Sequence, residues 1–514
     1  MNGKREYGDY QTPDSFAFDV CKYLKDTRKL NPSIVIEPTC GTGSFIKNSL
    51  IFGARKIIGI ELNPKYCKSC IDEISDNRVQ IINADIFSID LSNIIKNDSD
   101  ILVIGNPPWV TNSTLSTFNS INLPQKVNFK GLRGIDALTG ASNFDICEYI
   151  ILQLISALRG KRATIAMLCK TSVARNIFSE LHRNYISFSA CDILEFNANK
   201  VFGINASACL LVIELSNNNV TSAFCNVYSF YEPKIITNKI LYNSGRLQNQ
   251  VTHINNFLGK SCFEWRQGVK HDCSKIMELS LQNKSMINGL SEEVDIESCF
   301  VYPLVKSSMF KSVIIDRSDR YVIVTQKSIG EDTSHIKRDA PKTWNYLFSH
   351  KAFFEKRKSA IYKNTPAFAM FGVGEYSYAT YKVGVSGFYK KPLFSLLSAK
   401  SGCPIMTDDT SYFICLPTYD TAYTTMLILN SSIVQKYICS IAFLDSKRPF
   451  TKRVLDQIDF RKVLDVISVD DLIETEKQLG LVKRFNENML IDFKCLPEFG
   501  QIKLPLYASG HNIK

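Results

Sequence analysis

Short aliphatic runs alternate with longer amphipathic segments through the first 216 residues of the chain. Four of these runs end on a polar residue, and they occupy residues 33–37, 56–61, 79–85 and 100–106. Successive runs end 24, 24 and 21 residues apart, which leaves room for one helix between each pair of strands. Because this rhythm is typical of strand–helix–strand units, we predict an α/β domain with a doubly wound, mostly parallel sheet.

The pattern changes after an Asn/Ser-rich stretch at residues 216–230. Strands look shorter there, and the alternation of residues 371–392 favours β-ribbons and turns. Helical patterns return at residues 421–444 and 469–490. We therefore predict an α/β domain followed by an α+β domain, over residues 1–230 and 231–514.

The composition is that of an ordinary globular protein. The 514 residues are 45% hydrophobic and 22% charged, and a chain of this length favours two or three domains. No apolar stretch approaches the roughly 20 residues that span a bilayer. The first ten residues are polar and do not resemble a secretory signal. We therefore expect a cytoplasmic protein with no membrane partner.

Sixteen cysteines are scattered along the chain without the spacing of a disulfide framework. Cys67 and Cys70 form the one Cys-x-x-Cys pair of the sequence. A structural zinc site needs two further ligands at suitable spacing, and none follows nearby. We therefore predict no metal site.

Positive charge is concentrated in the second half of the chain. Residues 1–216 carry 23 basic against 21 acidic residues, whereas residues 301–400 carry 17 against 7. A neutral half joined to a basic half suits a catalytic domain beside a domain that binds a polyanion such as nucleic acid. A solvated basic surface would give the same counts, so charge alone does not decide between them.

The residues at the predicted strand ends are suited to a nucleoside-containing ligand, since doubly wound sheets bind ligands beyond the carboxyl ends of their strands. Gly41 and Gly43 follow the first strand and allow a tight turn with close approach of the backbone to a ligand. Glu61 follows the second strand, where a carboxylate can accept ribose hydroxyls. Asp85 follows the third, where it can accept from an adenine amino group. Taken singly, each acid could instead be a helix N-cap or a solvated strand end.

The tetrapeptide Asn106-Pro107-Pro108-Trp109 follows the fourth strand. Its two prolines fix the backbone and remove two donors. The amide oxygen of Asn106 and the carbonyl of Pro107 can together accept both hydrogens of an exocyclic amino group. This directs the nitrogen lone pair toward an incoming methyl group. Trp109 offers a flat surface on which a purine can stack.

The order and spacing of these motifs resemble the TaqI-like, or gamma, class of adenine-N6 DNA methyltransferases of restriction-modification systems. The resemblance covers residues 10 to about 216. It implies a Rossmann-like domain that binds S-adenosyl-L-methionine, followed by a target-recognition domain that binds double-stranded DNA. The cofactor-binding residues that it implies are Thr12, Pro13, Glu37, Pro38, Thr39, Cys40, Gly41, Gly43, Glu61, Asp85, Asn106 and Pro107. The catalytic residues that it implies are Asn106, Pro107, Pro108, Trp109 and Phe202.

Three shorter segments carry further resemblance. The run that contains Thr12 resembles the class's N-terminal cofactor motif, in which the threonine approaches the methionine part of the ligand. Asn143-Phe144-Asp145 resembles the helix start that follows the tetrapeptide. Phe202 resembles the aromatic residue that holds the other face of a flipped base, although a Phe before a strand is more often a core residue. The class most often has Tyr where this chain has Trp109, a change that preserves stacking.

Several segments of the second half pair aromatic with basic residues, as phosphate contacts and base readout require. The candidate DNA-binding residues are Arg266, Lys270, Lys382, Lys390, Lys391, Lys447 and Arg448. Each by itself is more typical of a phosphate contact or a solvated charge than of a base reader.

The leading hypothesis is transfer of a methyl group from S-adenosyl-L-methionine to the N6 amine of adenine in duplex DNA after base flipping, without metal. Methylation of a protein glutamine or of RNA is an alternative, because the same acceptors fit other planar amides and amines. The amine of cytosine would also fit. A third hypothesis is a non-catalytic DNA-binding subunit, which the presence of Glu61, Asp85 and Asn106 disfavours.

A fused nuclease is not expected. The first cofactor motif begins near residue 10, and Glu232-Pro233-Lys234 lacks the upstream Pro-Asp that would complete a nuclease metal site. The family implies a separate restriction endonuclease that shares the target sequence. The residues do not reveal the target sequence or the oligomeric state.

Overall fold

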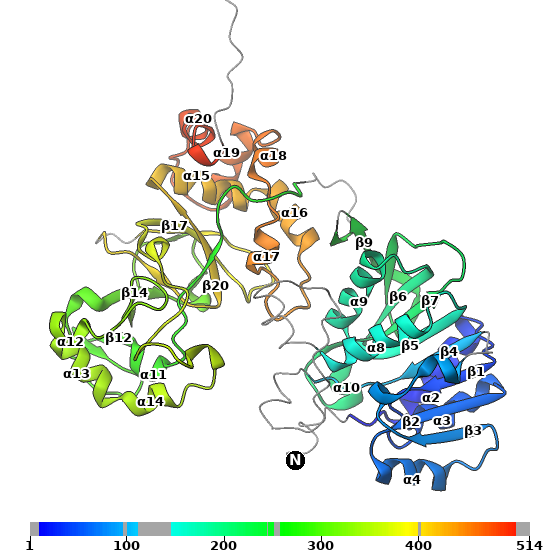
Figure 1. Cartoon of the computed structure of the whole chain (residues 1–514). Helices are drawn as coiled ribbons and strands as arrows, with labels where there is room; N and C mark the ends of the chain where they lie inside the picture. Colours follow the sequence, from blue (N-terminus) through cyan, green and yellow to red (C-terminus); the bar gives the residue numbers. More distant parts are fainter. Residues whose placement is uncertain are drawn as a thin grey trace, which may run out of the picture. The chain divides into compact units, whose positions relative to one another are not determined.

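The computed structural model describes residues 10–95, 100–110, 145–243, 245–250, 257–398 and 402–499. The chain divides into two compact units, Met1–Gln250 and Val251–Lys514, each with its own sheets (Figure 1). Among the described helices, none is long and apolar enough to cross a membrane.

The first unit is built on one sheet, whose described strands follow the order β10-β9-β8-β6-β7-β5-β4-β1-β2-β3. Five parallel strands carry the predicted rhythm: β1 Ile34–Glu37, β2 Lys56–Glu61, β3 Val79–Asn83, β4 Ile101–Gly105 and β5 Ala163–Lys170. β1 lies between β2 and β4, so the chain order reverses there. Such a switch point is where ligands bind in open α/β sheets. The predicted α/β class is confirmed.

The sheet continues beyond its parallel part. β7, Ser207–Leu215, runs antiparallel between β5 and β6, Phe188–Asn197. Three more strands follow: β8 Phe224–Ser229, β9 Glu232–Asn243 and β10 Arg246–Asn249. Because β9 and β10 pair onto this sheet, the first unit ends at Gln250, and the boundary predicted at residue 230 is wrong.

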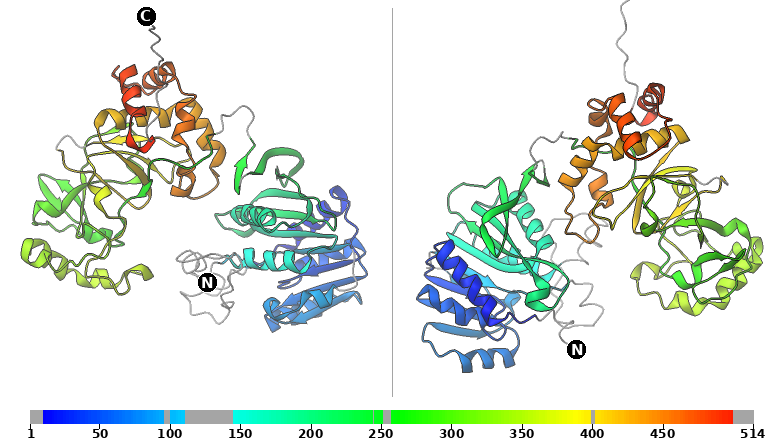
Figure 2. Two further views of the ribbon diagram at one scale, coloured as in Figure 1. Left: turned by 45° about the horizontal axis from the view of Figure 1, so that its top comes forward. Right: turned by 180° about the vertical axis from the view of Figure 1, so that it is seen from behind.

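Helices cover both faces of this sheet. α2, Asp14–Lys22, packs with α3, Ser44–Ser49, on one face, whereas α8, Ile146–Ala157, and α9, Thr171–Arg183, lie on the other (Figure 2). Because both faces are covered, β1 and β4 are buried at every residue, which explains their uninterrupted aliphatic sequences. α4, Pro64–Glu73, begins at the N-cap Asn63, whose side chain accepts from the amide of Lys65 at 3.0 Å.

The second unit contains two sheets of five described strands each. One consists of β11 Arg266–Gln267, β20 Ser411–Leu416, β17 Tyr381–Ser386, β18 Ser395–Leu397 and β15 Ile314–Ile315. The other consists of β13 Ser285–Ile287, β12 Glu278–Gln282, β16 Arg320–Ile323, β14 Val301–Val305 and β19 Met406–Thr407. Helices and sheets both contribute, as predicted for an α+β unit.

Helices dominate the end of the second unit. They include α15 Tyr419–Asn430, α16 Ser432–Ile441, α19 Val469–Gln478 and α20 Glu487–Lys494. The helical pattern at 421–444 forms two helices, because the backbone of Ser431 is extended and its hydroxyl donates to the carbonyl of Ile428 at 2.7 Å. The apolar faces of these helices share a core with Trp265 and Phe394.

Candidate active site

The loop between β1 and α3 passes directly over the carboxyl end of the sheet. Gly41 and Gly43 both have positive φ, of 53° and 90°. A Cβ on Gly43 would lie 2.4 Å from the sulfur of Cys70, so a larger residue does not fit without movement. The amide of Gly41 donates to Glu61 Oε2 at 2.8 Å, which ties the loop to the end of β2. The predicted loop residues 38–43 are therefore held in one compact turn.

The two acids after β2 and β3 are both bonded to backbone amides. Glu61 accepts from the amide of Asn63 at 2.7 Å as well as from Gly41, so its carboxylate is held at the end of β2 beside the glycine loop. Asp85 caps the short 3-10 helix Ile86–Ser88 and accepts from Phe87 N at 3.0 Å. Asp85 is thus a helix N-cap, the alternative to a ligand-binding acid that we considered from the sequence. Its other carboxylate oxygen lies at the same strand end.

Glu37 closes β1 and is 3% exposed. Burial, together with the nearby groups Cys70 and Glu61, raises the pKa of Glu37 well above its usual value. Its Oε2 and the hydroxyl of Thr39 are buried and make no hydrogen bond within the described residues. Buried polar atoms without partners are rare, so these two mark a place where a polar ligand could bind.

Asn106 is held at the first position after β4. Its Nδ2 donates to the carbonyl of Tyr10 at 2.8 Å and to the hydroxyl of Thr12 at 3.2 Å. These bonds fix which end of the amide is the acceptor, and Asn106 Oδ1 is buried without a partner in the described structure. Ser44 at the start of α3 donates to the carbonyl of Thr12 at 2.8 Å, so α3 braces the same segment.

Trp109 packs in an aromatic group with Tyr10 and Phe202. The rings of Trp109 and Phe202 have centroids 5.5 Å apart and meet edge to face at 75°, and Tyr10 lies 6.3 Å from Trp109. Phe202 ends α10, Ala198–Phe202, and is half-buried. The predicted sandwich is not formed in this arrangement, because a base between two parallel rings needs about 7 Å between their faces. Tyr10 is the first residue of the predicted N-terminal motif Tyr10-Gln11-Thr12-Pro13, but its place in this aromatic group was not predicted.

Lys170 and Asp145 brace the tetrapeptide from the side of β5. Lys170 Nζ lies 2.7 Å from Asp145 Oδ2 and donates to the carbonyl of Trp109 at 3.3 Å. Asp145 is the N-cap of α8 and accepts from the amide of Cys147 at 3.1 Å, so the helix start predicted there is confirmed. The preceding residues 143 and 144 lie outside the described residues. Lys170 was missed because it contacts the motif across a separation of 61 residues.

Gln11 lies against the glycine loop. Its Oε1 accepts from the amide and from the hydroxyl of Thr42, both at 3.2 Å, and would be 2.5 Å from a Cβ on Gly41. The N-terminal motif that contains Thr12 and Pro13 is therefore brought to the loop and to Asn106 at once. The groups predicted from three separate motifs do meet at one end of the sheet.

One of the predicted DNA contacts is wrong. Lys382 is 1% exposed in the core of the second unit, and its Nζ donates to the carbonyls of Ser377 at 2.8 Å and Ile405 at 2.7 Å. Burial lowers the pKa of Lys382 to about 8. A buried ammonium group that is hydrogen-bonded to internal carbonyls cannot reach a phosphate.

The other six candidate DNA-binding residues have side chains at the surface or partly exposed: Arg266, Lys270, Lys390, Lys391, Lys447 and Arg448. Arg266 pairs with Glu264 and stacks on Tyr376, 4.4 Å from the ring centroid. Lys390 donates to the carbonyl of Ser446 at 2.7 Å. These contacts orient the cations without burying them, so their DNA role stays a prediction.

No group of three or more His, Cys, Asp or Glu side chains among the described residues could hold a metal ion. Cys67 and Cys70 are both buried, reduced thiols beside the glycine loop.

The comparisons with known proteins agree with this geometry. The chain is 39% identical over 476 residues to the type II methyltransferase M.NspV of Nostoc sp. (strain ATCC 29411 / PCC 7524), covering 90% of this chain and 98% of that protein. It is 33% identical over 108 residues to the type II methyltransferase M.CvrRI of Paramecium bursaria Chlorella virus XZ-6E, which is 21% of this chain and 26% of the viral protein. It matches no protein-family model.

Among solved structures, the type IIL restriction-modification enzyme MmeI in complex with DNA is similar with a TM-score of 0.56. The match covers 93% of this chain and 74% of MmeI at 13% identity. At that identity the likeness shows a shared fold, and it extends over both halves of the chain.

Proposed function

The chain belongs to the type II methyltransferases, and on this premise we propose that it methylates the N6 amine of adenine in duplex DNA, with S-adenosyl-L-methionine as the methyl donor. Membership of this family supports methyl transfer as the reaction. The base, the position on the base and the roles of the residues below are the proposal.

The observation that carries the proposal is Asn106 Oδ1, which is buried and has no hydrogen-bond partner among the described residues. Leaving a buried acceptor without a partner costs about 1–3 kcal/mol, so its presence favours a substrate donor at that point. Asn106 Oδ1 and the carbonyl of Pro107 would accept the two amine hydrogens and hold the nitrogen lone pair toward the methyl carbon. The amine nitrogen would attack the methyl carbon in line while the bond from that carbon to sulfur breaks, with a neutral thioether as the leaving group, and one amine proton would then pass to water.

The residues at the glycine loop fit the proposed cofactor. Glycines at positions 41 and 43 leave a cradle in which the backbone is close to a ligand. Glu37 Oε2 and Thr39 Oγ1 are buried there and have no hydrogen-bond partner in the described part of the chain. Glu61 would accept ribose hydroxyls, and Asp85 would accept from the adenine amine. When bound, the cofactor supplies an electrophilic methyl group on a sulfonium.

The aromatic group of Tyr10, Trp109 and Phe202 would receive the flipped adenine. Stacking on an aromatic ring contributes about 1–3 kcal/mol per base. Because Trp109 and Phe202 now touch edge to face, Phe202 would have to turn away as the base enters. Trp109 is fixed from below, since its Nε1 donates to the carbonyl of Leu168 at 3.3 Å.

The proposal is tested by incubating the full-length protein with methyl-labelled cofactor and duplex plasmid DNA, followed by digestion and mass spectrometry of the nucleosides. We expect N6-methyladenine. Recovery of N4-methylcytosine would show that the base is wrong. Transfer to ribosomal RNA or to a release-factor protein, with none to DNA, would favour the alternative substrates of this site type.

Asn106→Ala tests the role of the carrying residue. Removing one preorganised group of this kind lowers kcat by about 10²–10³-fold in comparable sites, and we expect a loss of that size with DNA binding retained. Asn184→Ala is a matched control, because Asn184 caps the far end of α9 and its side chain donates to Glu180. Near wild-type turnover by the Asn106 variant would refute the assignment.

A cognate restriction endonuclease that shares the target sequence is the partner expected from the family. The pairing is tested in cells that express a candidate endonuclease. Survival of a plasmid that encodes the wild-type protein, and loss of one that encodes the Asn106→Ala variant, would support it.

A further inference from the structure

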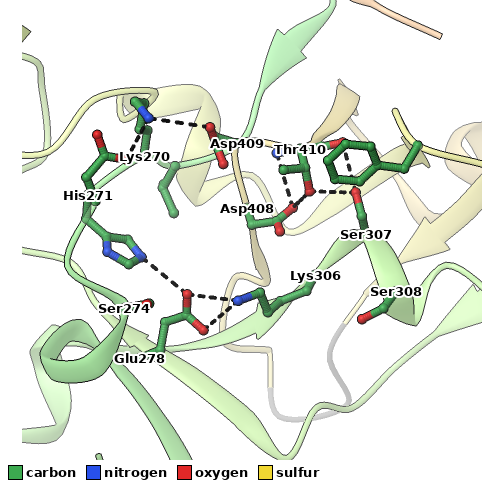
Figure 3. Close-up of a pocket in the computed structure, with 13 residues that line it drawn as sticks. Lys270, His271, Ser274, Glu278, Lys306, Ser307, Ser308, Asp408, Asp409 and Thr410 are labelled. Carbon is green, nitrogen blue, oxygen red and sulfur yellow. Dashed lines mark hydrogen bonds and ion pairs between the residues drawn. The ribbon is translucent and has the colours of Figure 1, made fainter. Parts of the chain in front are cut away.

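A pocket of about 630 Å³ opens in the second unit where three loops meet (Figure 3). Val269–Ser274 forms one wall, Lys306–Ser308 another, and the turn Asp408–Thr410 between β19 and β20 forms a third. The side chains that line it are mostly charged or hydroxyl-bearing, with both signs of charge present. This is unusual for a simple phosphate-binding surface, which gains nothing from carboxylates.

The turn Asp408–Thr410 is rigid. The carboxylate of Asp408 accepts from the hydroxyl of Thr410 at 2.7 Å, and the hydroxyl of Ser411 donates to the Asp408 carbonyl at 2.8 Å. Gly268 packs directly on the turn, since a Cβ there would lie 2.2 Å from the Asp408 carbonyl oxygen. A side chain carried by this turn is therefore held in a fixed position, as specific recognition requires.

Three side chains from two other segments converge on Asp409, which is carried by this turn. Lys270 Nζ lies 3.7 Å from Asp409 Oδ2 and 2.6 Å from Asp272 Oδ1. Gln267 and Arg448 both donate to the carbonyl of Asp409, and the guanidinium of Arg448 is oriented by stacking on Phe388, 5.1 Å from its ring centroid. The side chains of Lys270 and Asp409 are 32% and 28% exposed, so both can reach a partner.

The floor of the pocket is closed by a separate ion pair. Lys306 Nζ lies 3.0 and 2.8 Å from the two oxygens of Glu278, and His271 Nε2 lies 3.8 Å from the same carboxylate. The buried His271 also accepts from the amide of Cys273 through Nδ1 at 3.2 Å. These groups satisfy one another. Lys270 is bonded to Asp272, whereas its distance of 3.7 Å to the Asp409 carboxylate is too long for a hydrogen bond, so Lys270 and Asp409 can both still bond to a ligand.

We propose that Lys270 and Asp409 read one G·C base pair of the DNA target from the major groove. Guanine O6 accepts and cytosine N4 donates, and the two atoms lie about 2.9 Å apart because they are hydrogen-bonded to each other. A lysine ammonium beside a carboxylate at 3.7 Å presents the complementary donor and acceptor side by side. Lys270 has three donor hydrogens, so it can keep its bond to Asp272 while it donates to guanine.

The carboxylate makes this pair a base reader. DNA phosphates repel Asp409, so a DNA-facing Asp409 gains only from a donor such as the cytosine amine. The inference rests on the proposed function, since it takes DNA as the substrate, and it adds the residues that select one base pair of the target.

The test is methylation of a randomised duplex library by the wild-type protein, Lys270→Met and Asp409→Asn, followed by sequencing of the modified sites. The wild-type motif should contain a G·C pair at one position. In both variants we expect the preference at that same position to fall about tenfold, while the preferences elsewhere in the motif stay as they were. A good base contact is worth about 5–150-fold in discrimination.

Matched controls separate the outcomes. The double variant Lys342→Met with Asp295→Asn removes a more exposed ion pair, 2.7 Å long, from the same unit and should keep the full motif. Lys270→Met could instead weaken DNA binding equally on every sequence and reduce its salt dependence by about one phosphate contact. That result would assign Lys270 to a phosphate and overturn the inference. An unchanged motif in both variants would overturn it as well. If the wild-type protein methylates no DNA, the proposed function fails first and this inference falls with it.

Discussion

Lys382 offers the most quantitative prediction, because it was expected on the DNA surface and lies in the core instead. It is a buried cation without a carboxylate partner among its described contacts, held by the carbonyls of Ser377 and Ile405. The pKa of Lys382 falls to about 8 from an ordinary value of 10.5, because burial disfavours the charged form. We predict that this lysine makes the stability of the second unit depend on pH.

The sign follows from the protons bound in each state. Between pH 8 and 10.5 the unfolded lysine is protonated and the folded one is not, so stability rises with pH in that window. The pKa difference lowers the free energy of unfolding by about 3 kcal/mol below pH 8, and this penalty disappears above pH 10.5. Between pH 7 and pH 9.5 the free energy of unfolding should therefore gain about 2 kcal/mol from this residue alone.

The assay compares the urea unfolding of the wild-type chain with that of Lys382→Met, which has a similar length and no charge. Trp109→Phe is introduced into both proteins. The fluorescence of the remaining tryptophans, Trp265 and Trp344, then reports on unfolding of the second unit. Tyrosines and cysteines that do not interact with Lys382 cancel in the difference. Cys403 and Cys415 do interact with it, so both proteins also carry Cys403→Ser and Cys415→Ser. We expect the wild-type protein to gain about 2 kcal/mol relative to the variant between pH 7 and 9.5.

Lys391→Met is the control, because Lys391 is exposed and should give no such pH-dependent difference. A difference that stays constant with pH would refute the buried, shifted lysine. A reduced salt dependence of DNA binding in Lys382→Met would show that the residue does contact phosphate, contrary to the structure.

Three further predictions concern the first unit. Gly43→Ala should weaken cofactor binding at least tenfold by calorimetry because of the clash with Cys70, whereas Gly160→Ala, which has positive φ but open space around it, should leave cofactor binding unchanged. Trp109→Phe should keep methylation within about tenfold, while Trp109→Ala should lose about 5–150-fold, the worth of base stacking; equal rates would argue against stacking. Asp145→Ala should destabilise the first unit by about 1 kcal/mol more than Asp145→Asn in thermal unfolding, since Asn preserves the cap; equal stabilities would deny the capping role.

The first half of the fold could be predicted because its signals are local. Strand rhythm needs only the spacing of aliphatic runs, and Glu37, Glu61 and Asn106 lie where that spacing places them, at the ends of β1, β2 and β4. Asp145 as a helix start is local too. The domain boundary was misplaced because the polar stretch at residues 216–230 resembles a linker, yet part of it forms β8, which pairs with β6 on one side and with β9 on the other.

The second half could be predicted less well because charge type does not reveal burial. Lys382 lies on a strand next to Tyr381 and Val383, and its basic neighbours Lys390 and Lys391 made it look like part of a surface patch. Its carbonyl partner Ile405 is 23 residues away. Asp409 and Gln267 were missed because they meet across 142 residues, and no local pattern indicates that an acid belongs to the proposed base-reading site.

The tetrapeptide indicates where the site lies, but contacts with residues distant in sequence determine what Asn106 can do there. An aspartate at position 106 would supply an acceptor of the same size, but it could not donate to the carbonyl of Tyr10 and to the hydroxyl of Thr12. The amide is needed because its two ends have different tasks: nitrogen fixes the side chain to the N-terminal motif, and oxygen is left as a buried acceptor. The segment before α2 is therefore part of the proposed catalytic geometry, although it lies 94 residues from Asn106 in sequence.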